Sequence, residues 1–181
     1  MQRATRMFLG RSSPPAPSTE DELVPTHAVT FTDPSRRQLR DLLDVRGHWQ
    51  GGALFGALQG GTLTVRTITP LGPPAWSGQP LTPNMPYLLG WSDSLTSQYG
   101  DTTDWYGHWI AAPDGRLPDD RSDLTWLHLG AQQGFFDEFH VLVIVGIVEG
   151  YLTGRAYSWE EHGPQQVDCS FEHGTPRTDD Q

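Results

Sequence analysis

The chain has 181 residues and a mass of 20.1 kDa, which suffices for one domain with extended ends but not for two domains of ordinary size. Hydrophobic residues make up only 36% of the chain, yet seven Trp, five Tyr and seven Phe can build a core, which argues against wholesale disorder. The net charge of −10 argues against nucleic acid as a general partner, because binding to phosphates is driven by basic side chains that displace counterions.

The patterns along the chain predict a disordered arm over residues 1–26, one domain over 27–161 and an acidic, flexible tail over 162–181. Within the domain, alternating apolar residues indicate strands, apolar residues three or four apart indicate helices, and Gly or Pro marks the ends. In chain order, we expect a strand over 27–32, a helix from Asp33 to about Gly47, strands over 53–58 and 62–69, a Pro-rich loop over 70–86, a helix over 88–99, a strand over 105–111, a helix from about Asp120 to Gln133, and strands over 141–145 and 152–159.

The numbers of cysteines and lysines and the length of the apolar runs limit the possible chemistry and the expected cellular location of the protein. Cys169 is the only cysteine, so the chain forms no intramolecular disulfide, and we expect a cytoplasmic protein. All twelve basic residues are arginines, which removes Schiff-base chemistry and the lysine of phosphate-binding loops. No apolar run approaches the roughly 18 residues that cross a bilayer, so we expect no membrane partner.

Three short motifs carry a family resemblance. They are Gly51-Gly52 before a predicted strand, and then Gly107-His108-Trp109 and Pro113-Asp114-Gly115 on and after another. These motifs and the order of the predicted elements resemble the JAMM/MPN metalloprotease family over about residues 29–159. The resemblance implies an α/β fold, a cytidine-deaminase-like single domain in which a mixed sheet is flanked by helices.

The resemblance also marks the positions that carry chemistry in the family. In this chain they are Trp49 (for the catalytic glutamate), Ile110 and Ala112 (for the two zinc-binding histidines), Asp120 (for the serine) and Asp123 (for the aspartate). Only Asp123 matches the residue type of the family.

These replacements remove the chemistry of a zinc hydrolase. Catalytic zinc needs three protein ligands and an open position for water, and Ile110 and Ala112 have no lone pairs to offer. No glutamate lies between Glu22 and Glu138 to act as the general base. We therefore expect a catalytically inactive domain without catalytic residues, cofactor or metal.

Two functions follow from this interpretation. Inactive members of the family commonly act as scaffolds, so the resemblance implies binding to a protein partner, such as another MPN domain or a ubiquitin-like protein, and is compatible with a homodimer. Trp76 in the Pro-rich loop and Trp49 beside the vestigial site are the candidate partner-binding residues. The alternative is a zinc-dependent isopeptidase or peptidase with rewired ligands, for which His48, His108 and Asp123 are the candidates.

Overall fold

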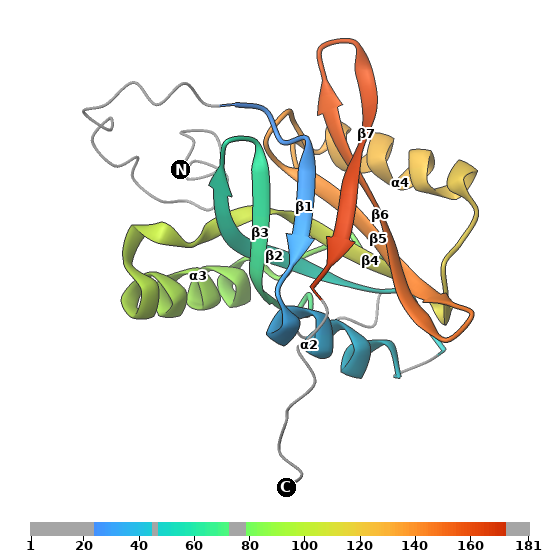
Figure 1. The fold of residues 1–181 in the computed structure, drawn as a ribbon, viewed down its shortest axis with the longest axis horizontal. Coiled ribbons are helices and arrows are strands. Elements are labelled where there is room, and N and C mark those ends of the chain that lie inside the picture. The colour runs from blue at the N-terminus through green and yellow to red at the C-terminus, as the bar shows by residue number, and fades with distance from the viewer. Residues whose placement is uncertain (1–23, 45–46, 73–78, 173–181) are drawn as a thin grey trace, which may run out of the picture.

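Seven strands make up most of the regular secondary structure in the computed structural model of the protein, which describes residues 24–44, 47–72 and 79–172. They form one closed barrel in the order β1-β3-β2-β4-β5-β6-β7 (Figure 1). The strands are β1 (Ala28–Phe31), β2 (Gln50–Gln59), β3 (Thr62–Ile68), β4 (Asp104–Arg116), β5 (Val141–Val148), β6 (Tyr151–Glu160) and β7 (Gly163–Phe171). The helices of the described residues are α2 (Asp33–Leu43), α3 (Met85–Tyr99), the short 3₁₀ helix η2 (Gly100–Thr102) and α4 (Asp120–Gln132).

The closure of the barrel corrects the fold class expected from the sequence. The expected JAMM/MPN-like α/β fold, with a mixed sheet flanked by helices, is wrong, because β1 is paired on both of its edges. It runs parallel to β3, with Val29 opposite Leu63, and parallel to β7, with Val29 opposite Cys169. Pairing between segments so far apart in the chain leaves no local pattern in the sequence, so periodicity alone could not predict closure.

The prediction of a flexible tail over residues 162–181 is wrong for residues 163–171, which form strand β7 of the barrel. Val167, Cys169 and Phe171 alternate along it and pack toward the interior, whereas the residues between them are exposed. Only one face of this strand is buried, so its polar half makes the whole segment resemble a solvated tail.

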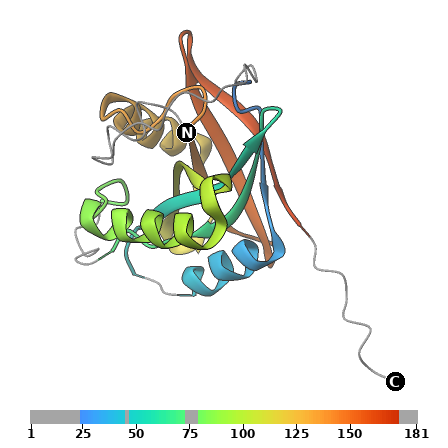
Figure 2. The ribbon, with the colours of Figure 1, turned by 90° about the vertical axis from the view of Figure 1, so that its left-hand side faces the viewer.

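Three apolar clusters hold the fold together. The largest fills the barrel with alternate side chains from its strands, and α2 lies across one end (Figure 2), where it adds Leu39 and Leu43. The second lies between α3 and the outer faces of β2 and β4, where Leu88 and Leu95 pack with Trp105. The third lies under α4 and forms the candidate site described below.

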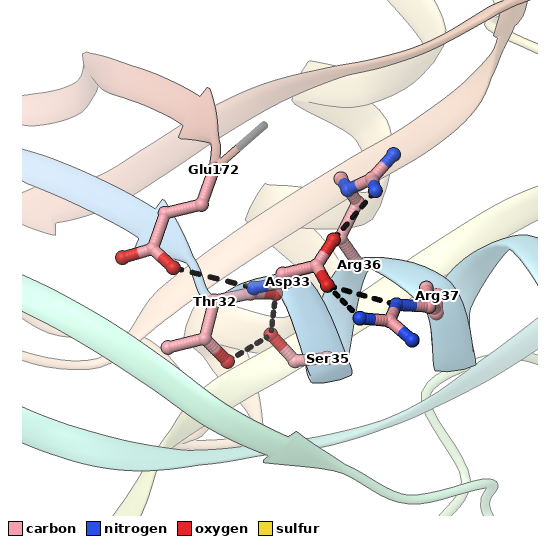
Figure 3. Close-up of polar contacts among 6 residues, drawn as sticks. All are labelled: Thr32, Asp33, Ser35, Arg36, Arg37 and Glu172. Carbon is pink, nitrogen blue, oxygen red and sulfur yellow. Dashed lines mark hydrogen bonds and ion pairs between the residues drawn. The ribbon is translucent and has the colours of Figure 1, made fainter. Parts of the chain in front are cut away.

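The start of α2 is tied to the end of β7 (Figure 3). The Glu172 carboxylate accepts a hydrogen bond from the backbone N–H of Asp33 at 3.3 Å, which satisfies a donor in the first helical turn. The Asp33 carboxylate accepts from Arg37 and, at 2.6 Å, from Arg36. These two guanidinium groups, that of Arg37 first, lower the pKa of Asp33 to about 2. Thr32 is the N-cap of α2, and Asp33 is its first residue.

None of the helices in the described segments is both long and apolar enough to cross a membrane.

Candidate functional site

The structure brings most of the predicted vestigial positions together on one outer face of the barrel. Ile110 lies on β4 and is buried beneath α4, which carries Asp120 and Asp123. Trp49 directly precedes β2, whose Gly51 lies opposite Ile110 in the β2–β4 ladder. We call this packed region the α4 cluster; it consists of Leu81, Ile110, Leu127, Phe135, Phe136, Leu142, Ile144 and Tyr157, with Trp49, Leu117, Trp126 and Trp159 packed against it.

Asp123 is the polar centre of the α4 cluster. Its side chain is fully buried, and one carboxylate oxygen, Oδ2, accepts hydrogen bonds from Arg155 Nε at 2.5 Å and from the Tyr157 hydroxyl at 2.8 Å. Arg155 also donates from its terminal nitrogen to the carbonyl of Pro118 at 2.5 Å, at the loop that leads into α4. Helix α4 is thus fixed to β6 through a buried ion pair.

The two partners of Asp123 on β6, Arg155 and Tyr157, both have raised pKa values. The hydrogen bond to Asp123 raises the pKa of Arg155, so that its guanidinium is charged at any pH of interest. Burial, followed by the hydrogen bond to Asp123, raises the pKa of Tyr157 to about 12, so its hydroxyl stays protonated and acts as the donor. The network is therefore one carboxylate held between a permanent cation and a neutral phenol.

Apolar and aromatic packing fills the rest of the predicted site. The rings of Trp49 and Trp126 meet edge to face with their centroids 5.1 Å apart, and both are half-buried. Ala112 is half-buried near the outer end of β4, and Asp120 is exposed in the first turn of α4. The N-cap of α4 is Asp119, whose carboxylate accepts from the backbone N–H of Ser122 at 3.1 Å.

The Gly51-Gly52 motif has a packing role in this fold. A Cβ atom on Gly52 would lie 1.5 Å from the carbonyl oxygen of Thr69, and one on Gly51 would lie 2.6 Å from that of Pro80. The same Thr69 carbonyl accepts a hydrogen bond from the indole nitrogen of Trp109 at 2.9 Å. Gly52 lets β2 approach the end of β3 closely, and Gly51 lets it approach the backbone at Pro80, which is a structural reason for their presence.

His108 is not part of the hydrogen-bond network around Asp123 and lies among aromatic rings. It is fully buried, and its ring centroid is 5.0 Å from that of Phe135 and 5.3 Å from that of Trp105. Neither ring nitrogen has a hydrogen-bond partner among the described residues. Burial, together with the nearby His140, lowers the pKa of His108 to about 3, so the ring is neutral at physiological pH.

The alternative ligand set is not assembled in the structure. His48 is half-buried next to Trp49, His108 lies among the aromatic rings described above, and Asp123 is engaged by Arg155. Across residues 24–44, 47–72 and 79–172, no three His, Cys, Asp or Glu side chains gather closely enough to hold a metal ion. Trp76, the other candidate for partner binding, lies outside the described residues.

A surface groove of about 440 Å³ adjoins the α4 cluster. Asp120, Arg121 and Leu124 line it from α4, and Tyr157 lines it from β6. Leu124 is 48% exposed at this groove, although it is a large apolar side chain. The face of α4 therefore offers an apolar contact flanked by charged groups of both signs.

Sequence reasoning missed Arg155 and Tyr157, the two residues that determine what Asp123 does. The alternation of side chains along a strand could have indicated them. Ala156 faces the barrel interior, so the residues on either side of it must face outward. What the sequence could not supply was the position of α4 above this face of β6.

The comparisons with known proteins inform the fold and not the site. The chain matches no model of a protein family, and no curated protein matches it. The solution structure of protein DSY2949 from Desulfitobacterium hafniense, a structural genomics target, is similar to it with a TM-score of 0.56 and 13% sequence identity. The match covers 83% of this chain and 97% of that one, and at this identity it shows a shared fold alone.

Proposed function

We propose that this protein acts by binding another protein chain and does not hydrolyse a substrate at the α4 cluster. The observation that carries the proposal is the engagement of Asp123, the one residue that matches the catalytic pattern of the JAMM/MPN family. Its buried carboxylate already serves as counter-ion to Arg155 and as acceptor for Tyr157.

The chemistry of this network is unfavourable for zinc. A divalent cation bound to Asp123 would lie close to the Arg155 guanidinium, whose Nε is 2.5 Å from the carboxylate oxygen, and the two positive charges would repel each other. Ile110, buried on β4, offers only carbon atoms at the position that the family pattern gives to a zinc-binding histidine. The residues present thus suit a packed support for α4 better than a hydrolytic centre.

The exposed face of α4 is the surface that we propose for partner binding. Leu124 provides an apolar contact of the kind found at the centre of protein interfaces, and Asp120 and Arg121 flank it with opposite charges. The ion pair below, whose carboxylate is fully buried, anchors α4 to β6, and such anchoring reduces the entropy lost on binding. The sequence motifs still make an MPN domain or a ubiquitin-like protein the first partner classes to test, in the cytoplasm.

Site-specific photo-crosslinking tests the proposal. A photoreactive amino acid replaces Leu124 in the full chain, and the matched control carries it at Tyr99, a large side chain on α3 that is 49% exposed. We expect one protein to be crosslinked from position 124 and not from position 99. The purified partner should then bind the native chain and lose at least about tenfold in affinity with Leu124→Arg, since an unpaired charge would be placed in an apolar contact.

The same preparation tests the alternative function. Zinc is added to the purified chain, bound metal is measured after dialysis, and hydrolysis of peptide and isopeptide substrates is followed. Stoichiometric zinc with hydrolysis that is lost in His108→Ala would contradict the proposal and restore the rewired peptidase. Equal crosslinking from positions 124 and 99 would contradict the assignment of the binding surface.

A further inference from the structure

A second exposed surface lies where the β5–β6 hairpin turns, away from the groove beside Leu124. The side chains of Val148 and Tyr151 are register partners in the β5–β6 ladder, so they lie on the same face of the hairpin. They are 42% and 74% exposed, and Tyr151 is the most exposed of the large hydrophobic residues in the described segments. An apolar cross-strand pair is thus presented to solvent at the tip of the barrel.

Val148 lines a groove of about 550 Å³ whose rim carries both signs of charge. Arg116 comes from the end of β4, Asp114 precedes it, and Glu149 comes from the hairpin turn. In the described part of the chain, the side chains of Arg116 and Glu149 form no hydrogen bond or ion pair. Both charges are therefore available to an incoming surface.

Glu149 occupies its place at a conformational cost. The two-residue turn has positive φ at both positions, 52° at Glu149 and 85° at Gly150, as a type I′ turn requires. Glu149 is the only non-glycine residue with positive φ in the described residues, and asparagine or glycine would adopt this conformation more easily. A carboxylate at this position is consequently not explained by the turn itself.

We propose that this hairpin surface binds a second copy of the same chain in a two-fold symmetric dimer. A two-fold axis near Val148 and Tyr151 would bring the apolar pairs of both copies together. It would also place Arg116 of each copy against Glu149 of the other, since an isologous interface repeats each contact twice. Arg116 and Glu149 are complementary across the axis, and Asp114 leaves the patch with one net negative charge, whereas the chain as a whole is strongly acidic and repels its own copy at long range.

The size of the patch sets the strength of the dimer. The groove and Tyr151 together comprise about nine residues, compared with roughly 20–30 residues on each side of a standard interface. We therefore expect a weak dimer, with a dissociation constant of about 10–100 µM, near physiological ionic strength, where long-range repulsion between the acidic chains is screened. This inference uses a different surface from the α4 face and does not depend on the proposed function.

Sedimentation equilibrium of the full chain up to about 1 mM tests the dimer. We expect Tyr151→Ser to weaken self-association at least tenfold, while Tyr99→Ser, the control on α3, leaves it unchanged. Arg116→Glu and Glu149→Arg should each weaken it by a similar factor, and the double exchange should restore it to within about threefold of the native chain, because the ion pairs are re-formed with reversed polarity.

Glu149→Asn separates folding from association. It should raise the melting temperature by relieving the turn and yet weaken the dimer at least threefold, because the carboxylate is lost. A native chain that stays monomeric at 1 mM, assembly beyond a dimer, or a double exchange no better than the single variants would each overturn the inference.

Discussion

Replacing His108 with leucine tests whether this histidine is a buried neutral side chain, as the structure indicates. Its pKa is lowered to about 3 in the folded protein, from an ordinary value of 6.5. Below pH 6.5 the unfolded chain binds a proton on this histidine that the folded chain does not accept. The free energy of unfolding is therefore highest above pH 6.5 and falls as the pH drops toward 3. From this residue alone, the native chain should lose about 2 kcal/mol of unfolding free energy between pH 6.5 and pH 4.5.

The His108→Leu variant should lack this loss. At pH 7 we expect its stability to be within about 1 kcal/mol of the native value, because leucine has a similar volume and buries no polar nitrogen. Urea unfolding followed by tryptophan fluorescence at several pH values between 7.5 and 4.5 gives the difference between the two chains. His162→Gln, at an exposed position in the turn between β6 and β7, is the control and should keep the native slope. Parallel pH profiles for His108→Leu and the native chain would refute the reasoning and mean that the ring of His108 is accessible to protons or to a ligand.

Three further predictions concern packing and reactivity. Arg155→Met should destabilise the protein by about 3–5 kcal/mol in urea unfolding, because it leaves the buried Asp123 carboxylate without a counter-charge, and adding Asp123→Leu should recover much of that loss. If the single and double variants are equally unstable, the ion pair does not account for the effect. Gly52→Ala should prevent folding or cost more than about 4 kcal/mol, since its Cβ would overlap a backbone carbonyl, and native-like circular dichroism and melting would contradict this packing. Burial raises the pKa of the Cys169 thiol to about 12, so we expect slow alkylation by iodoacetamide at pH 8 in the native state and rapid alkylation in urea; equal rates by mass spectrometry would show the thiol to be exposed.

Local signals in the sequence predicted most of the elements. The apolar run over 141–145 lies within β5, and the predicted strands over 53–58 and 62–69 correspond to β2 and β3. The helix predicted from about residue 120 to 133 corresponds to α4, which spans residues 120–132. These features depend on neighbours in the chain, and local periodicity and turn residues determine them.

Features that depend on distant residues were not predicted. The hydrogen-bond partners of Asp123 lie 32 and 34 residues further on, on β6, where no local pattern points to them. Ile110 and Trp49 both lie at the α4 cluster, and the side chains that surround them became visible only with the packing of α4. β7 was missed because one of its faces is polar.

The position of β1 between β3 and β7 makes the order of synthesis matter. The first strand of the domain needs a partner that is made about 140 residues later, so the edge of β1 that faces β7 stays open until nearly the whole domain has left the ribosome. Until then the nascent chain presents unsatisfied backbone groups to other proteins, and a truncation before residue 163 should leave that edge permanently prone to aggregation.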